Sequence, residues 1–318
     1  MIFIFSSPRS GSTWLAQLLG SHPDTIYLHE PDVVDRGNDL LPHWFAQEPV
    51  GYEDRAREYL LRLCANRNLR TVGVPPFFRK RYRSEFNRLL RACLIYLGKG
   101  TEKAGYLSLA NKFSIPDLAA ASPAGWSPIL VIKSVSALGR AEVFLRSGHP
   151  MAAILLLRHP CGYVHSYLQG VRLGLMPKPS GLGKLLETRT ARRLNAKSFV
   201  HDGSEYVDQL CWEWLLANCE AHAAISKAGG MVLNYDDLAR GGETQLHALF
   251  ATLGLEWSDR TSQFLKQHSS IDGSYYSLSR SAGAADRWIS QMAPQDIARV
   301  RDIACRDTIG RRFFNSQS

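Results

Sequence analysis

The fold of this 318-residue chain is decided near its N-terminus, by the stretch Ile2-Phe3-Ile4-Phe5-Ser6-Ser7-Pro8-Arg9-Ser10-Gly11-Ser12-Thr13-Trp14-Leu15. The apolar run Ile2–Ser6 is typical of a strand that is covered on both faces, and a helical pattern over Thr13–Leu19 follows it. The loop between them gathers backbone N–H groups and the positive end of a helix dipole at one point, which favours an anion. The alternative is that its hydroxyl side chains only cap a helix.

The residue types in this loop suit an oxyanion. Gly11 lets the backbone approach a ligand closely, and Arg9 adds a delocalised charge with several donors. Further hydroxyl donors come from Ser10, Ser12 and Thr13. The loop is not a Walker A motif, because no Gly-Lys-Ser/Thr is present, and it is not a G-x-G-x-x-G dinucleotide fingerprint.

Apolar runs elsewhere in the chain predict four more strands. They lie at Ile26–Leu28, Ile129–Ile132, Ala152–Leu157 and Met231–Leu233. Helical patterns separate the strands, at Tyr52–Cys64, Tyr206–Ala224 and Gln245–Leu253. Strands that alternate with helices predict an α/β fold, with a mostly parallel central sheet and helices on both faces.

The composition is that of an ordinary globular protein. A hydrophobic fraction of 45% excludes a disordered or fibrous chain. The formal charge of +9 favours anionic partners: a nucleotide, a nucleic acid, an acidic glycan or, by peripheral contact, an anionic membrane surface. No run of 18 apolar residues predicts a membrane span, and no secretory leader pattern is found. Six scattered cysteines predict reduced, buried thiols and a cytoplasmic protein.

Two segments are rich in basic residues. The first runs from Arg79 to Arg91 and the second from Arg172 to Lys197. Each is either a solvated face or an electropositive lid over an anionic ligand. The second segment suits a mobile lid, because its glycines and prolines are expected to prevent regular structure near it: Gly170, Gly174, Pro177, Pro179, Gly181 and Gly183.

A second candidate anion contact lies in the middle of the chain. Arg158 directly follows the apolar run Ala152–Leu157, so it should face the ligand crevice at the carboxyl end of a strand. Pro160 suits the start of the next helix, and Ser166 falls within its first two turns. The alternative is a structural arginine and an unrelated surface serine.

These two elements together resemble a known family. The run Pro8–Leu15 resembles the 5′-phosphosulfate loop of sulfotransferases that use 3′-phosphoadenosine 5′-phosphosulfate (PAPS). That family also has an Arg at a strand end and a Ser eight positions later, as Arg158 and Ser166 are here. The resemblance implies a P-loop-kinase-like sulfotransferase fold in a single domain over residues 1–318. Insertions at about 35–125 and 170–205 would form the acceptor site and a lid.

Weaker similarities extend the resemblance along the chain. His22-Pro23-Asp24 and Tyr27–Pro31 resemble the second-strand region of carbohydrate sulfotransferases. Leu233–Leu238 is similar to their Y-E-D-L segment, and Ser279–Ser281 with Arg287-Trp288 resembles a final cofactor-contacting stretch.

The resemblance implies roles for the nucleotide-site residues. Arg9 would stabilise the leaving group, Gly11, Ser12 and Thr13 would hold the 5′-phosphate together with Ser10, and Arg158 and Ser166 would grip the 3′-phosphate. Arg280 is implied as a further cofactor contact. Trp14 stands where related enzymes stack an aromatic ring near the adenine, although a core tryptophan is an equal alternative.

The acceptor hydroxyl requires a base, and the resemblance places Glu30 in that role. His29 is the competing base, but strand alternation would turn it to the opposite side from Glu30. Cytosolic sulfotransferases carry K-[ST]-H after their third strand, whereas this chain reads Lys133-Ser134-Val135. A histidine base from that strand is therefore excluded. Lys133 would contact the sulfonate or the acceptor, or it only ends the strand.

The expected activity is in-line transfer of a sulfuryl group from PAPS to a hydroxyl of a carbohydrate, a glycolipid or another small alcohol. No metal is expected to be required and no metal-ligand motif is found, nor is a nucleic-acid partner expected. Two alternatives stay open: a nucleotide-dependent kinase of related fold, and a non-enzymatic basic protein that binds anions or nucleic acid.

Overall fold

The computed structural model describes residues 1–103, 114–118, 127–201, 204–241, 243–268 and 282–315. Within these ranges one sheet of five strands has the order β2-β3-β1-β4-β5, and every neighbouring pair is parallel. The strands are β1 (Ile2–Ser6), β2 (Thr25–His29), β3 (Ile129–Ser134), β4 (Ala152–Leu157) and β5 (Met231–Asn234). All five predicted strands and the parallel α/β architecture are therefore confirmed.

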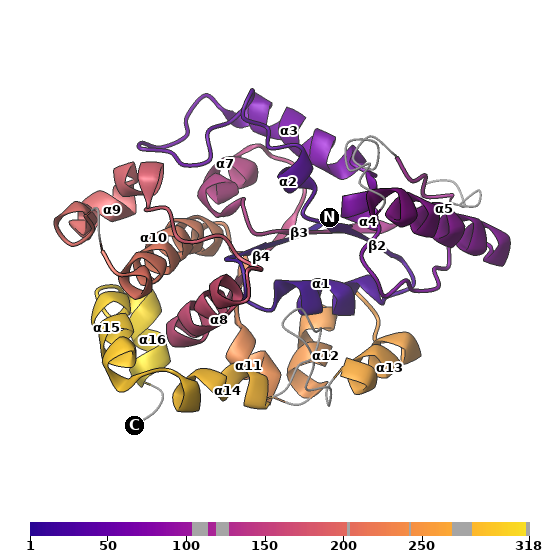
Figure 1. Cartoon of the computed structure of the whole chain (residues 1–318). Coiled ribbons are helices and arrows are strands. Elements are labelled where there is room, and N and C mark those ends of the chain that lie inside the picture. The colour runs from indigo at the N-terminus through magenta and orange to yellow at the C-terminus, as the bar shows by residue number, and fades with distance from the viewer. Residues whose placement is uncertain (104–113, 119–126, 202–203, 242, 269–281, 316–318) are drawn as a thin grey trace.

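Strand alternation divides the core into two layers. Phe3 and Phe5 of β1 face one layer, and Ile2 and Ile4 face the other. All four side chains are buried because helices cover both faces of the sheet (Figure 1). A continuous apolar run in the sequence is the consequence of this double cover.

The Phe3 face carries the larger layer of helices. α10 (Tyr206–Lys227) packs along it with the fully buried Trp212 and Trp214. Around it lie α3 (Glu53–Ala65), α7 (Ala141–Arg146), α8 (Pro160–Arg172), α15 (Pro294–Ala304) and α16 (Thr308–Asn315). The short elements on this part of the chain are α2 (Pro31–Val34), η1 (Leu138–Arg140), η2 (Gly183–Glu187), α9 (Arg189–Arg193) and η3 (Ala196–Ser198).

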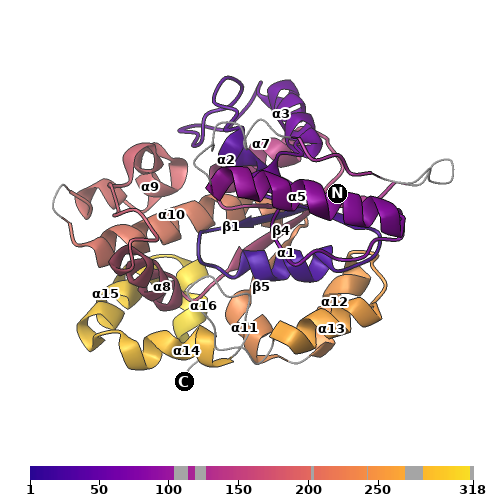
Figure 2. The same ribbon diagram turned by 45° about the vertical axis from the view of Figure 1, so that its right-hand side comes forward.

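The Ile2 face is covered by α1 (Ser12–Gly20), α11 (Tyr235–Arg240), α12 (Glu243–Thr252) and α13 (Asp259–His268). α14 (Ala282–Gln291) bridges the two layers, because Ala285 belongs to one and Trp288 to the other. At the edge formed by β2 lie α4 (Leu69–Val72) and α5 (Glu85–Lys103). In the view that brings this edge forward, α5 lies in front of the sheet (Figure 2).

The strand order reverses beside β1. The chain passes from β1 outward to β2 and β3 and then crosses to β4 on the other side of β1. Ser6 at the end of β1 is in register with Leu156 near the end of β4. In open parallel sheets such a reversal leaves a crevice beyond the carboxyl ends of the strands, where ligands bind. The loop after β1 and the residue after β4 meet at this crevice.

Two expectations are corrected. Gly170 lies inside α8 and Gly183 begins η2, so regular structure is not prevented at these two glycines, whereas residues 173–182, with the other glycines and prolines, hold no helix or strand, as predicted. Helix formation succeeds after Gly183 because the stretch there carries Thr188 as the N-cap of α9. Of the six free cysteines, Cys93 is exposed rather than buried. No helix in the described ranges has the length and apolar character that a membrane crossing demands.

Candidate functional site

The loop between β1 and α1, here called the anion loop (residues 7–13), ends in a left-handed glycine. Gly11 is the N-cap of α1 with φ 80°, and a Cβ built there would lie 2.2 Å from Cδ2 of Tyr235. Only glycine suits both the backbone conformation and the close ring. Arg9 also has a positive φ, of 64°. The chain thus turns sharply, and the first N–H groups of α1, which have no intrahelical partner, point out of the helix end.

Buried hydrogen bonds hold the anion loop in place. The hydroxyl of Ser10 donates to the carbonyl of Ser7 over 2.8 Å, and Asn218 Nδ2 donates to Ser7 Oγ over 3.0 Å. The Ser10 hydroxyl is thereby committed to the loop itself. Its backbone, rather than its side chain, is what this residue can offer to a ligand.

The two elements that lie far apart in the sequence meet at this loop. Arg158 Nη1 donates to the carbonyl of Arg9 over 2.7 Å, and Arg9 Nε donates to Ser166 Oγ over 3.2 Å. The register of β1 against β4 brings Arg158 beside the loop, and α8 carries Ser166 back over it. A Cβ at Gly162 would lie 3.1 Å from Arg158 Nε, so this glycine makes room for the guanidinium. Arg9, Arg158 and Ser166 therefore form one polar cluster.

The segment after β5 forms the wall behind this cluster. Arg158 lies over the ring of Tyr235, with its Cζ 5.4 Å from the ring centroid. Asp236 accepts a hydrogen bond from the backbone N–H of His159 over 2.6 Å. Burial raises the pKa of Asp236, although the charge of Arg158 opposes this. The L-N-Y-D-D-L segment was noticed in the sequence, but the contact between Tyr235 and Gly11 could not be read from it.

A second polar group lies at the carboxyl ends of β2 and β3. Lys133 Nζ donates to Glu30 Oε1, and the two residues also share a 2.8 Å bond from the Glu30 N–H to the Lys133 carbonyl. His29 Nε2 lies 3.9 Å from Glu30 Oε1, and its Nδ1 is 2.6 Å from Tyr27 Oη. Lys133 is almost fully buried, with 3% of its surface exposed.

The expectation that His29 and Glu30 point to opposite sides is wrong. The strand ends at His29, and Glu30 has left-handed backbone angles of φ 44° and ψ 55° as the N-cap of α2. Alternation applies only while the backbone stays extended. The turn at Glu30 therefore brings the carboxylate back toward the imidazole and the Lys133 ammonium.

The electrostatics of this group set its charge at neutral pH. Burial would raise the pKa of Glu30, but the charge and hydrogen bond of Lys133 outweigh it and hold that pKa below its ordinary value. Burial, helped by the charge of Lys133, lowers the pKa of His29 to about 4. At pH 7 the carboxylate is ionised and the imidazole is neutral.

A cleft of about 960 Å³, including its open mouth, is lined by Ser7 and Pro8 of the anion loop and by Asp32 of α2. We call it the Asp32–Glu213 cleft. Burial raises the pKa of Asp32 to about 6, against a hydrogen bond from Ser134, and burial raises the pKa of Glu213 to about 7. Val135, which stands at the histidine position of the K-[ST]-H pattern, also lines the cleft. The remaining lining residues are Val33, Arg36, His43, Trp44, Ser136, Leu138 and Ala217.

The sequence analysis did not single out Asp32 or Glu213. Glu213 stands between Trp212 and Trp214 in an otherwise apolar part of α10, and this isolated charge was the one available sign. Asp32 carried no such sign. Both reach the cleft through packing of α2 and α10 against the anion loop.

The other predicted site residues divide into three cases. Ser12 and Thr13 begin α1, as expected for a helix N-terminus beside the loop. Trp14 is 3% exposed within the Ile2-face core, so in this structure its ring is a core side chain. Arg280 lies outside the described residues. No group of three or more metal-binding side chains is present in the described part of the chain.

Comparisons with known proteins find similarity to one family over the N-terminal part of the chain. The model of the sulfotransferase family matches residues 2–73, which include β1, the anion loop, α1 and β2. No curated protein matches the sequence.

Solved structures that resemble the chain are also sulfotransferases. A sulfotransferase domain from the curacin biosynthetic pathway is 16% identical, with 95% of this chain and 96% of that chain covered and a TM-score of 0.47. A mouse sulfotransferase complexed with PAP is 12% identical, with 99% and 88% covered and a TM-score of 0.44. A sulfotransferase from Alicyclobacillus acidocaldarius is 14% identical, with 98% of each chain covered and a TM-score of 0.39. These scores carry no further argument; the family match over residues 2–73, which hold the anion-loop motif, shows that this part of the chain is similar to the sulfotransferase family.

Proposed function

We propose that the enzyme transfers the sulfuryl group of PAPS to a hydroxyl of a carbohydrate, a glycolipid or another small alcohol. The observation that carries the proposal is the cluster in which Arg158 contacts Arg9 and Arg9 contacts Ser166. A doubly phosphorylated adenosine needs two anion sites a short distance apart. The loop after β1 and the cluster behind it supply two such sites at one end of the sheet.

The nucleotide roles follow from this placement. The N–H groups of Gly11, Ser12 and Thr13 at the start of α1 suit the 5′-phosphate. Arg158 and Ser166 suit the 3′-phosphate, for which a planar guanidinium offers paired donors. Arg9 stands between them and would neutralise charge on the leaving phosphate oxygen. Trp14 and Arg280 are retained as proposed nucleotide contacts, the first near the adenine.

The transfer step assigns a proton acceptor. The acceptor oxygen forms a bond to sulfur while the bond from sulfur to the 5′-phosphate oxygen breaks, leaving 3′-phosphoadenosine 5′-phosphate (PAP). Glu30 receives the hydroxyl proton, since its carboxylate is ionised at pH 7. In the free enzyme Lys133 compensates this carboxylate. A bound sulfonate would compete for the same ammonium, and loss of that ion pair would make Glu30 a stronger base.

The Asp32–Glu213 cleft is the proposed acceptor site. Residues 36, 43 and 44 contribute to its wall, which supports an acceptor-site role for the insertion at about 35–125. The segment 170–205 is proposed as a lid, within a single domain over 1–318. Raised pKa values make Asp32 and Glu213 suited to hydrogen-bonding sugar-like hydroxyls in either protonation state.

Thermal shift with PAP tests the nucleotide site. At a PAP concentration of about 100 times Kd, the wild-type chain should gain ~2.7 kcal/mol of stability, seen as a rise in Tm. Arg158→Ala should lose most of this gain. Arg172→Ala, an exposed arginine at the end of the same helix, is the matched control and should keep it. An unchanged gain in Arg158→Ala would refute the proposed 3′-phosphate contact.

A further inference from the structure

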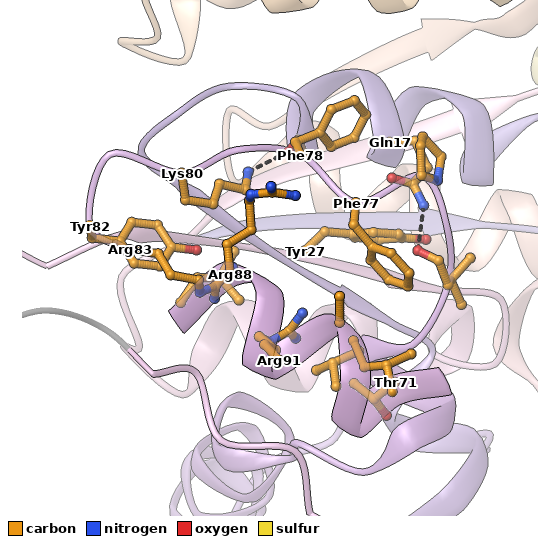
Figure 3. Close-up of a pocket in the computed structure, with 17 residues that line it drawn as sticks. Gln17, Tyr27, Thr71, Phe77, Phe78, Lys80, Tyr82, Arg83, Arg88 and Arg91 are labelled. Atoms are coloured by element: carbon orange, nitrogen blue, oxygen red, sulfur yellow. Dashed lines mark hydrogen bonds between the residues drawn. The ribbon is translucent and has the colours of Figure 1, made fainter. Parts of the chain in front are cut away.

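A second pocket lies at the β2 edge of the sheet, away from the anion loop. It occupies about 680 Å³, including its mouth, between α1, β2, α4, α5 and the loop 74–83 (Figure 3). It meets α1 at Gln17 and Gly20, near the helix C-terminus. The anion loop lies at the other end of this nine-residue helix, about 13 Å away along its axis. The two sites are therefore distinct.

One wall of the pocket is apolar and aromatic. It includes Tyr27, Phe77 and Phe78, which are labelled in Figure 3. Val72 and Ile95 also line the pocket. The lining, apolar with a few polar groups, is of the kind that binds small organic molecules.

Another part of the lining is cationic. Arg83, Arg88 and Arg91 line the pocket, and no aspartate or glutamate is among its lining residues. Arg88 is neutralised by Glu85, with its Nε 2.7 Å from Oε2. Among the described residues, Arg83 donates a hydrogen bond to the carbonyl of Asp117, over 2.8 Å. Neither Arg83 nor Arg91 forms an ion pair with a carboxylate of the described residues.

Arg91 is the most informative of these residues. Its Nε is buried and has no hydrogen-bond partner among the described residues. Burial lowers its pKa to about 10, the nearby charge of Arg83 adds to this, and the carboxylate of Asp117, which is itself paired with Arg67, opposes it. Because a largely buried guanidinium without a direct ion pair is costly, an anion that enters the pocket would relieve an existing penalty rather than create a new one.

Lys80 does not fill this role. Its Nζ donates to the carbonyls of Gly20 and His22 and lies 3.3 Å from Thr25 Oγ1, so it holds the loop 74–83 against the end of α1. The cationic wall available to a ligand thus consists of Arg83 and Arg91, with Arg88 at their side.

We propose that this pocket, here called the Arg91 pocket, binds an amphiphilic organic anion. The charged head, a carboxylate or a sulfate, would pair with Arg91 and Arg83, and the aliphatic or aromatic body would lie against Phe77, Tyr27 and Val72. The lining combines cationic and apolar side chains, so neither an inorganic anion nor a neutral hydrocarbon uses the whole site.

Isothermal titration of the full chain with decanoate, without nucleotide, tests the proposal. One equivalent should bind saturably. Decanol, which keeps the chain and lacks the charge, and inorganic sulfate, which keeps a charge and lacks the chain, should each bind at least about tenfold more weakly. Decanol or sulfate binding as tightly as decanoate would overturn the proposal.

Two substitutions locate the binding. Arg91→Met roughly keeps the length of the side chain and should weaken decanoate binding at least about tenfold. Arg88→Met should weaken it less, because Arg88 is already paired with Glu85. Ala92→Trp should block the pocket while all charges remain. Ala92→Trp therefore distinguishes decanoate binding in the pocket from binding to the exposed apolar side chains of α5, such as Phe86 and Leu97. Undiminished binding in either Arg91→Met or Ala92→Trp would contradict the assignment.

Independent readouts separate this proposal from the nucleotide site. Removal of an unpaired buried charge should leave the Tm of ligand-free Arg91→Met unchanged or higher, and PAP should bind both variants as it binds the wild type. Loss of decanoate binding with normal PAP binding supports the Arg91 pocket alone. A clear fall in the Tm of Arg91→Met would show that the arginine serves packing and would overturn its role as an anion site.

Discussion

The anion loop and the Glu30–Lys133 group lie at the same end of the sheet but are built in different ways. The loop comes from one continuous stretch, and its ligand groups are largely backbone N–H groups at the start of α1. The Glu30–Lys133 group joins two strands 103 residues apart and depends on side chains and on one left-handed residue. Backbone sites leave a local motif in the sequence, whereas side-chain sites assembled by packing do not.

The largest effect is expected where the backbone site is most constrained. Gly11→Ala would place a Cβ 2.2 Å from the Tyr235 ring at a φ of 80°. Strain and overpacking together should cost ~2–5 kcal/mol of unfolding free energy, and PAP binding should fall sharply. Denaturant unfolding and titration with PAP measure the two effects.

Gly181→Ala is the matched control for this substitution. Gly181 has a φ of 86°, but a Cβ there has no neighbour within 4 Å. Gly181→Ala should therefore cost only the ~1–2 kcal/mol of unfolding free energy that a left-handed backbone costs a residue with a Cβ. PAP binding should stay intact. Equal losses in the two variants would mean that the contact with Tyr235 does not constrain the loop.

The side-chain site is tested by Glu30→Gln. The amide still accepts a hydrogen bond from Lys133 but cannot take a proton. We expect kcat to fall by about 10² or more while PAP affinity is kept. Steady-state kinetics with PAPS and an accepted alcohol, together with PAP titration, measure the split. A near-normal rate in Glu30→Gln with no activity in His29→Ala would transfer the base role to His29.

The pH profile distinguishes the carboxylates. A general base is active when deprotonated, so the rate falls as pH drops through its pKa. With Glu30 held below its ordinary value of 4.5 in the free enzyme, kcat/KM for PAPS should persist below pH 5. A fall near pH 6 or pH 7 would point instead to Asp32 or Glu213.

A smaller effect concerns the cleft. Burial raises the pKa of Glu213 from its ordinary 4.5 to about 7, so the unfolded chain ionises first as pH rises. Burial of the charged Glu213 carboxylate therefore lowers the unfolding free energy, and this loss is absent below pH 4.5 and complete above pH 7. Glu213→Gln should therefore raise stability by ~2 kcal/mol at pH 8 and leave it unchanged at pH 4. Thermal unfolding at the two pH values measures this, with the exposed Glu58→Gln as control. A gain of equal size at both pH values would refute burial of the charge as its cause.

The smallest effect is expected for Ser166→Ala. It removes one 3.2 Å bond from Arg9 and one proposed contact to the nucleotide. A single hydrogen bond corresponds to ~1 kcal/mol, or about a fivefold loss in PAP affinity. Titration with PAP measures it. A loss as large as that of Arg158→Ala would mean that Ser166, rather than the guanidinium, dominates the site.

The same contrast explains what the sequence could predict. The five strands followed from apolar runs, since double cover of the sheet demands them. The approach of Arg158 to the anion loop followed from strand ends that share one edge. The position of the Glu30 side chain relative to His29 could not be predicted. A single residue with positive φ turns its side chain to the other side of the strand, and no sequence pattern marks such a residue. The same holds for Glu213 and Arg91, whose surroundings come from distant segments.

The central claim is that the anion loop and the Arg158 cluster hold opposite ends of one nucleotide. A crystal structure of the chain with PAP tests it most directly. The account predicts the 5′-phosphate hydrogen-bonded to the N–H groups of residues 11–13 and the 3′-phosphate on the Arg158 guanidinium and Ser166. PAP bound with its 3′-phosphate away from Arg158, or bound at another place on the sheet, would contradict it.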